Sequence, residues 1–242
     1  MAKKSRLRFK YDSPVVSTFV IICTLLFLAD IFIAKGKLIS SFLTCPGTKE
    51  SGGLAAFNFK KAFDYVKIFT HIFGNSGWET LFVNFAFILV SGPVYEEKYG
   101  SVYILIMCLA SGIISGVLNA CMSPFASTGA ASIVFTMIFL SMITAFSKKT
   151  FSLSSLLILL LYIGYEFYCV INISAADGVK MNALLLVPVL ADLIAGICGS
   201  LFGFMASPKK KSPSSAKTIL QEKEKYPSSS YSSDETVVGT LN

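Results

Sequence analysis

Charged side chains are scarce in this 242-residue sequence: Asp, Glu, Lys and Arg together make up 14% of it, whereas hydrophobic residues make up 54%. The mean hydropathy of +0.67 is well above that of soluble globular domains. A soluble protein of this composition would have too little polar sequence to cover itself, whereas membrane-spanning helices use apolar residues in the core and on the lipid-facing side. The composition therefore predicts an all-α integral membrane protein.

Paired cysteines, a signal-peptide cleavage site and internal repeats are also missing. The six cysteines form no C-x-x-C pair and lie mostly in apolar segments, so we expect no metal site, no cofactor and no disulfide framework. No small-residue cleavage site precedes Asp30, so we expect the first apolar run to remain as a span. The lack of internal repeats weakens a transporter function.

Long apolar runs, by contrast, are abundant. A helix needs about 20 mostly apolar residues to cross roughly 30 Å of hydrocarbon. Six segments meet this requirement, so we predict a bundle of six transmembrane helices over residues 14–206. The predicted spans are Pro14–Ala34, Trp78–Tyr95, Val102–Met122, Ala130–Phe146, Leu153–Ile171 and Asn182–Ala206.

Basic residues, which give the chain a net charge of +7, are grouped at the ends of these runs. Clusters occur within residues 3–10, at Lys148–Lys149 and within residues 209–211. Because Lys and Arg near span ends are retained in the cytoplasm, this spacing predicts an even number of spans with both termini cytoplasmic, and it explains the charge without nucleic-acid binding. We expect residues 1–13 to be a cytoplasmic segment and the Ser-, Lys- and Pro-rich residues 207–242 to be a disordered cytoplasmic tail.

The connection between the first two spans, residues 35–77, is longer than any other and should contain structure of its own. Within it, residues 57–73 interleave aromatic and aliphatic side chains with polar ones such as Lys60, Asp64 and Lys67. This pattern suits a helix that lies in the membrane interface. An irregular extracellular loop is the alternative.

Small residues recur at four-residue spacing in two predicted spans. Gly112 and Gly116 share a face of the third span, and Ala195, Gly199 and Gly203 share a face of the sixth. Because lipid offers no hydrophobic drive for helix association, such faces let helix backbones approach closely. We therefore expect close helix contacts at both faces.

Polar residues at membrane depth are energetically costly, so each is a candidate functional residue. Asp192 falls near the middle of the sixth predicted span, Asn84 within the second and Glu166 within the fifth. Asp30 lies near the outer end of the first span, where we expect it to reach the interface. For Glu166, which has tyrosines close by, both a structural and a functional role stay open.

The sequence HIFGNSGWETLFVN, followed by GPVYEEKYG, resembles the second span and following loop of the rhomboid intramembrane serine proteases. The resemblance places His71 and Asn75 at the entrance of this span and Asn84 at the family's oxyanion-binding asparagine. It places Glu96 at the glutamate of the family's G-x-x-x-E-x-x-x-G turn. Thr80 stands where the family usually has a histidine, so an oxyanion hole here would be partial.

The resemblance continues at the fourth span, where the family carries its nucleophile in a G-x-S-G motif. Here the sequence reads Gly129-Ala130-Ala131-Ser132, which puts Ala131 at the nucleophile position and Ser132 at the following glycine. A second register, ending at Gly129, would put Thr128 at the nucleophile position. We prefer the first register because the second shifts the following Val-Phe pair by three residues.

In the sixth span the family has A-H-x-x-G-x-x-x-G, whose histidine is the general base. Residues 191–199 resemble this pattern with Asp192 in place of the histidine, and Gly199 is one of the small residues that pack this helix on the fourth. The chain's only histidine, His71, aligns with no general base. An alanine has no nucleophile to activate, and Ser132 would point about 100° around the helix from position 131.

The resemblance thus implies a rhomboid-like fold without an intact catalytic pair. We expect a multi-pass pseudoprotease of a bacterial inner membrane, whose partners are the lipid bilayer and the transmembrane segments of other membrane proteins, bound without cleavage. An active serine endopeptidase that uses Ser132 or Thr128 with Asp192 as a desolvated base is one alternative. A small transporter with Asp192 and Asn84 as its site is a second alternative.

The rhomboid resemblance makes a geometric prediction that coordinates decide. Asn84, Ala131 and Asp192 should converge in one polar cavity. Gly199 should pack against the fourth helix near Ser132.

Overall fold

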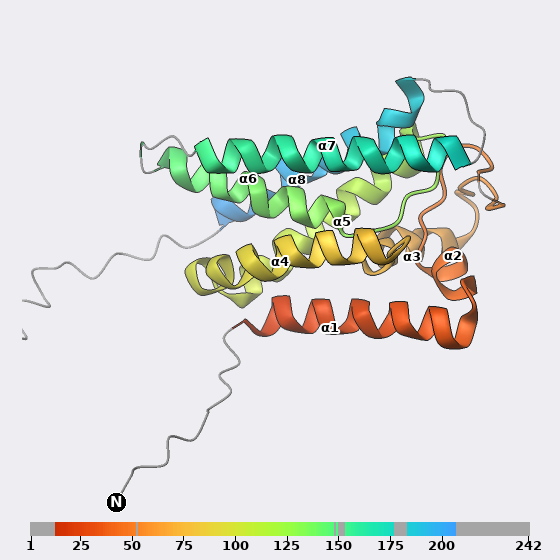
Figure 1. Cartoon of the computed structure of the whole chain (residues 1–242), viewed down its shortest axis with the longest axis horizontal. Helices are drawn as coiled ribbons and strands as arrows, with labels where there is room; N and C mark the ends of the chain where they lie inside the picture. Colours follow the sequence, from red (N-terminus) through yellow and green to blue (C-terminus); the bar gives the residue numbers. More distant parts are fainter. Residues whose placement is uncertain (1–12, 52, 148, 150–152, 177–182, 207–242) are drawn as a thin grey trace, which may run out of the picture. The chain divides into compact units, whose positions relative to one another are not determined.

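Helices form nearly all of the regular structure in the computed structural model, which describes residues 13–51, 53–147, 149, 153–176 and 183–206 (Figure 1). The predicted N-terminal segment up to residue 12 and the predicted tail at residues 207–242 lie outside the described residues. The elements are α1 (Pro14–Ala29), η1 (Asp30–Ala34), α2 (Lys37–Phe42), α3 (Ala62–Thr70), η2 (His71–Phe73), α4 (Trp78–Tyr99), α5 (Ser101–Met122), α6 (Ala131–Ser147), α7 (Leu153–Ala176), η3 (Ala183–Leu186) and α8 (Val187–Ala206).

The predicted helical membrane bundle is confirmed. Among the described residues, five helical stretches are long and apolar enough to cross a membrane, and α6 is a shorter apolar helix between them. The second span runs to Tyr99 rather than ending at Tyr95, and the last begins as the 3₁₀ turn η3 before α8. The five long stretches are Pro14–Ala34, Trp78–Tyr99, Ser101–Met122, Leu153–Asn172 and Leu184–Met205.

The short helix α6 is the centre of the bundle. It packs against α4, α5, α7 and α8, and every residue from Ala131 to Ile138 is buried. The segment before it is an extended loop, held by paired backbone hydrogen bonds of 2.8 and 2.9 Å between Cys45 and Ser127. Irregular backbone is tolerated within a membrane bundle where protein encloses it. The enclosed loop before α6 therefore occupies the depth that an additional helical turn would fill if α6 were as long as the other spans.

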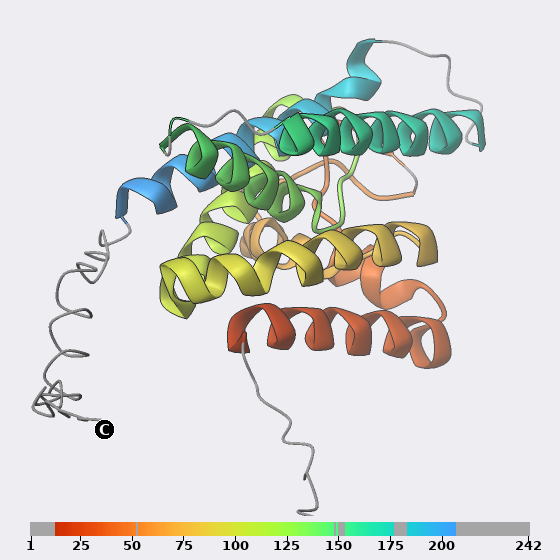
Figure 2. The same ribbon diagram turned by 60° about the vertical axis from the view of Figure 1, so that its left-hand side comes forward.

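The two ends of the bundle differ in what they carry. The start of α1, the end of α6, the start of α7 and the end of α8 lie at one end, whereas the described part of residues 35–77 lies at the other (Figures 1 and 2). An even number of crossings brings the first and last helices to the same side. The basic clusters predicted this even number of spans; the cytoplasmic placement of the two termini stays a prediction.

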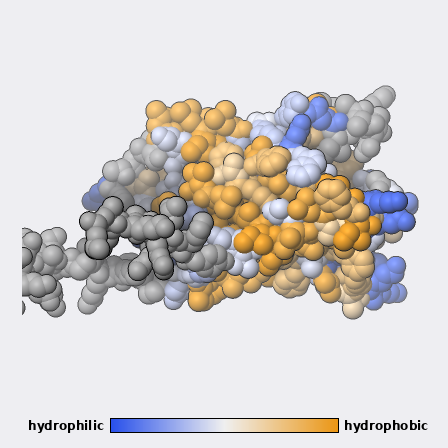
Figure 3. Space-filling model, turned by 60° about the horizontal axis from the view of Figure 1, so that its bottom comes forward, coloured by the Kyte–Doolittle hydropathy of each residue, from blue (hydrophilic) through white to orange (hydrophobic). Residues whose placement is uncertain are grey.

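The outward faces of the long helices are apolar. Figure 3 shows hydrophobic side chains covering the middle of one face of the molecule, with hydrophilic residues toward its edges. Soluble monomers rarely expose contiguous apolar patches larger than a few hundred Å². These faces are suited to lipid. Exposed examples are Leu25, Val90, Val102, Leu161 and Met205.

Residues 35–77 contain the short helices α2, α3 and η2. In α3, Asp64, Lys67 and Ile68 are buried, whereas Phe63 and its neighbours along the same face are exposed. The exposed apolar side chains are Phe63, Val66 and Phe69. A helix with one apolar face outward, rather than an irregular loop, therefore forms within the predicted segment; its place in a membrane interface stays a prediction.

Small residues permit close packing, as predicted, but not always between spans. A methyl group added at Gly116 of α5 would lie 2.8 Å from the carbonyl oxygen of Ile68, so this face receives α3 of the connecting segment rather than another span. On α8, a methyl group at Gly199 would lie 2.8 Å from Cβ of Ser111 and 3.2 Å from Oγ1 of Thr136. Gly199 thus packs between α5 and α6, one turn beyond Ser132.

Two buried carboxylates cap helices. The Glu96 oxygens accept hydrogen bonds of 2.9 and 3.0 Å from the backbone N–H groups of Val15 and Val16, which opens α1 against the end of α4. Asp30 is also buried, at 5% exposure, and accepts hydrogen bonds from the first residues of α2. Free N–H groups at a helix start need such acceptors. Asp30 therefore serves as a cap, which its expected place near the interface did not anticipate.

Candidate functional site

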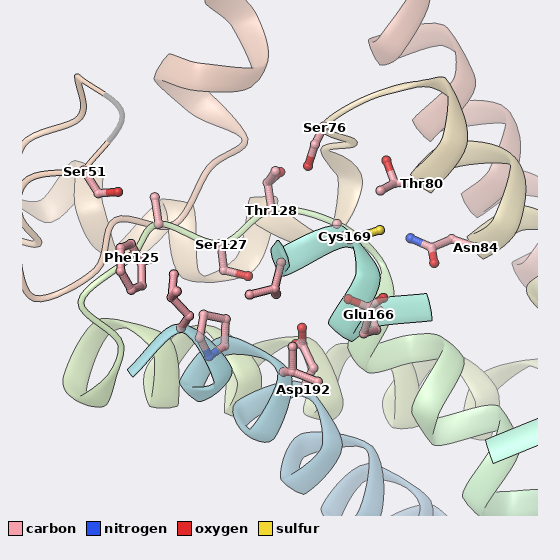
Figure 4. A pocket seen from close by; sticks show the side chains of 17 residues that line it. Ser51, Ser76, Thr80, Asn84, Phe125, Ser127, Thr128, Glu166, Cys169 and Asp192 are labelled. Carbon is pink, nitrogen blue, oxygen red and sulfur yellow. The ribbon is translucent and has the colours of Figure 1, made fainter. Parts of the chain in front are cut away.

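A cavity of about 190 Å³ lies at the end of the bundle that carries residues 35–77. Its walls come from the starts of α4, α6 and α8, the second half of α7, and the loop before α6. Asn84, Ala131 and Asp192, which the sequence predicted to converge, all line it. Thr80, Thr128, Glu166 and Cys169 add further polar groups to the lining (Figure 4).

Asn84 is held with its amide nitrogen toward the cavity. The side chain is only 3% exposed, and its Oδ1 accepts a 2.7 Å hydrogen bond from the hydroxyl of Tyr162 on α7. Tyr162 is fixed in turn by edge-to-face contacts with Phe87 and Phe135. The amide oxygen is thus occupied. Figure 4 shows the nitrogen directed into the cavity, where it can donate a hydrogen bond to a ligand.

Asp192 is engaged on one side only. Its Oδ1 accepts a short hydrogen bond from the hydroxyl of Ser115, a fully buried residue of α5. The carboxyl group also lines the cavity. Sequence reasoning missed Ser115, although Ser111, Ser115 and Asn119 form a polar row at four-residue spacing along α5 that could have indicated it.

Ala131, the residue predicted at the nucleophile position, is the first residue of α6 and lines the cavity. Ser132 does not reach it: the side chain is fully buried, and within the described part of the chain its hydroxyl makes no hydrogen bond. Its carbonyl oxygen instead accepts hydrogen bonds from Ser111 and Thr136. The 100° turn of the helix between the two positions thus separates Ser132 from the site.

Thr128, the other fallback nucleophile, lines the cavity but is committed elsewhere. Its hydroxyl donates a 2.7 Å hydrogen bond to the carbonyl oxygen of Leu43. The next residue, Gly129, has a φ of +130°, which favours glycine, and its N–H donates to the carbonyl oxygen of His71. These bonds join the loop before α6 to residues 35–77 and leave no Thr128 proton aimed at a base.

Thr80 also lines the cavity, yet its hydroxyl caps the start of α4. It donates a 2.9 Å hydrogen bond to the carbonyl oxygen of Gly77 and accepts one of 3.2 Å from the Gly77 N–H. A threonine hydroxyl has one proton to donate. Of the two residues predicted to form the oxyanion hole, only Asn84 therefore directs a donor into the cavity.

The entrance residues His71 and Asn75 lie outside the cavity. Both are buried, at 1% exposure, and a methyl group at Gly116 would lie 3.1 Å from the His71 ring, so they sit where residues 35–77 meet α5. The Nδ1–H of His71 donates to the carbonyl oxygen of Ile68, whereas Nε2 has no partner in the described structure. Burial lowers the pKa of His71 to about 4, so the ring is neutral at pH 7.

Cys169 is a further cavity residue that sequence reasoning missed. It lies on α7, one turn after Glu166, and lines the same cavity as Asn84 (Figure 4). Both residues follow the helical spacing of Tyr162, so the polar face of α7 was visible in the sequence. In the described residues, no group of three or more His, Cys, Asp or Glu side chains is arranged to hold a metal ion.

Comparison with known proteins identifies a family for this chain. Residues 62–210 match the family model described as the Rhomboid domain, which spans well over half of the chain. No curated protein matches the sequence. The matched region contains α4 to α8 and so includes every helix that lines the cavity.

Proposed function

Since this chain belongs to the rhomboid family of membrane proteins, we propose that it is a pseudoprotease that binds transmembrane segments of other membrane proteins without cleaving them. One observation carries the proposal: Ala131, which the resemblance places at the family's nucleophile position, lines the cavity. An alanine methyl group cannot attack a peptide carbonyl.

The other groups in the cavity do not replace the missing pair. Hydrolysis by a serine or cysteine protease needs a nucleophile hydrogen-bonded to a base that accepts its proton. Thr128 donates to a backbone carbonyl instead, and the hydroxyl bound to Asp192 belongs to Ser115, which does not line the cavity. Cys169 offers a thiol, but no imidazole lines the cavity.

Features that suit binding are retained. The bundle keeps a cavity large enough for a side chain, and the Asn84 amide supplies a preorganised donor for a peptide carbonyl oxygen. A donor that stabilises a developing oxyanion also binds a ground-state carbonyl, and without a nucleophile only this binding remains. Such a protein would hold or sequester a membrane client.

The proposal includes an orientation. Both termini would face the cytoplasm and residues 35–77 the opposite side of a bacterial inner membrane, because the basic clusters flank the end of the bundle where α1 starts and α8 ends. Reporter fusions after Phe146 and after Ala206 should both report the cytoplasm. A periplasmic signal at either position would contradict the orientation.

Fluorophosphonate labelling tests the loss of activity. The reagent reacts with an activated serine, so we expect no labelling of the wild type, of Ala131→Ser or of Asp192→His. The variant that combines Ala131→Ser, Ser132→Gly and Asp192→His restores the family pattern, and weak labelling is expected there alone. The single variants should stay unlabelled because a nucleophile and its base act as one unit.

Two controls keep the experiment decisive. An active rhomboid protease in the same detergent shows that the reagent works, and Ser132→Ala and Thr128→Ala remove the fallback hydroxyls. Labelling of the wild type that either substitution abolishes would overturn the pseudoprotease proposal in favour of an active serine endopeptidase.

A further inference from the structure

The cavity is acidic on one side. Asp192 and Glu166 both line it, from α8 and α7, and among the residues that the structure describes no Lys, Arg or His lines it. Asp192 is 9% exposed and satisfied at one oxygen by Ser115. In surroundings of low dielectric, carboxyl groups at membrane depth typically face a partner of opposite charge or a hydrogen-bond donor. None of the described residues supplies a cation to this wall.

A second, independent group points to a ligand. The Asn84 side chain is 3% exposed, its oxygen accepts the hydrogen bond from Tyr162, and its nitrogen opens into the cavity with no acceptor among the described residues. A donor in the wall of a cavity has to be satisfied by whatever fills that cavity, so a ligand that enters here must place a hydrogen-bond acceptor beside Asn84. The start of α6, at Ala131, adds partial positive charge to the same wall.

The two walls together select the class of ligand. One wall offers donors for a carbonyl oxygen, and the other offers carboxyl groups for a cation, so a simple anion or a simple cation satisfies only half of the site. A stretch of polypeptide with a basic residue presents both groups. A lysine or arginine side chain also suits a cavity of about 190 Å³, which is many times the space that one water needs.

We propose that this cavity selects membrane partners that carry a lysine or arginine within the outer part of their transmembrane segment. The inference rests on the proposed function and names the chemistry that its binding site recognises. A basic residue in a lone transmembrane helix is costly, and pairing with Asp192 and Glu166 lowers that cost. The affinity for a partner helix thus depends on its basic residue, the one that is most costly to place in the membrane.

The depth of the site predicts where the basic residue lies. Asn84 is the seventh residue of α4 and Asp192 the sixth of α8, counted from the end of each helix nearest the cavity. At a rise of about 1.5 Å per residue, both lie roughly 8–9 Å inside the helix ends. The basic residue should therefore lie one to two turns inside the outer end of the partner helix.

The experiment uses synthetic single-span peptides and the full-length protein in nanodiscs of phosphatidylcholine and phosphatidylglycerol. The probe is a fluorescent leucine–alanine helix with one lysine at the sixth position from its outer end. One control peptide has norleucine at that position, and another has its lysine at the sixth position from the inner end. Binding is measured by energy transfer to a labelled protein.

We expect the outer-lysine peptide to bind about tenfold more tightly than both controls. Asp192→Asn combined with Glu166→Gln should reduce the preference to about twofold or less, because an amide in place of each carboxylate keeps shape but not charge. The asparagine oxygen can still accept the Ser115 hydrogen bond. The matched control is Glu97→Gln, which neutralises an exposed carboxylate of α4 and should leave the preference intact.

The outcomes separate this inference from the proposed function. Equal binding of all three peptides would overturn the inference and leave the pseudoprotease proposal standing, as would a preference that survives in the double variant. No binding of any peptide would overturn both. Discs containing phosphatidylethanolamine test a lipid ammonium group as the ligand: loss of the lysine preference there would assign the cavity to lipid and overturn the inference.

Discussion

Glu96 offers a sharp test of how the bundle is assembled. Its carboxylate, 3% exposed, accepts the N–H groups of Val15 and Val16, and the residue before α1, Ser13, provides no side-chain cap. Glu96→Ala leaves both donors buried and unpaired. Hydrogen bonds to a charged group contribute about 1.5–3 kcal/mol each, so the variant should lose about 3–5 kcal/mol of the free energy of unfolding.

A thiol-reactive dye in detergent measures this loss, because buried cysteines such as Cys23 react only on unfolding. For a chain of this length, about 3–5 kcal/mol corresponds to a fall in Tm of roughly 6–20 °C. Glu96→Gln keeps one acceptor oxygen and should lose about half as much. The control is Glu97→Ala, whose side chain is exposed. If Glu96→Ala and the Glu97→Ala control unfold at the same Tm, the capping role of Glu96 is refuted.

Three further predictions follow from packing and protonation. Burial lowers the pKa of His71 from 6.5 to about 4, so on acidification the unfolded chain binds a proton at this residue before the folded protein does. The free energy of unfolding should therefore fall by about 2 kcal/mol from pH 6.5 to pH 5. His71→Gln should flatten this dependence on pH, as measured by denaturant titrations. Gly196→Ala should lower the Tm, since its new methyl group meets α6, whereas Gly164→Ala, with nothing within 4 Å, should not. Burial raises the pKa of Cys45 to about 12, so maleimide should label the exposed Cys121 in the folded protein and reach Cys45 only after unfolding, as read by peptide mass spectrometry.

The fold was predictable from sequence because a bilayer restricts the possibilities so strongly. Spans of about 20 apolar residues follow from hydrocarbon thickness alone, and the ends of α5 and α8 came out as expected. The shortness of α6 was less visible, because it depends on how a loop is enclosed by other helices. The turns η1 and η3, which extend α1 and α8, also have no feature in the nearby sequence that predicts them.

The candidate site was predictable where a motif fixes position, and unpredictable where packing does. Asn84 and Asp192 were identified from their types and places in spans. The Ser115 hydroxyl that meets Asp192, and the Tyr162 hydroxyl that orients Asn84, come from other helices, and hydrophobic periodicity does not say which faces meet. Cys169 was passed over because a cysteine in an apolar span is usually a small packing residue.

The central claim is that the protein has a rhomboid fold and binds membrane helices without hydrolysing them. The most direct measurement incubates the wild type in nanodiscs with a single-span substrate of an active rhomboid protease and analyses the substrate by intact mass spectrometry. The account predicts that the substrate co-purifies with the protein and keeps its full mass over the time in which the active enzyme converts it. A cleavage product that disappears in Ser132→Ala, Thr128→Ala or Cys169→Ala would contradict the account and identify the nucleophile.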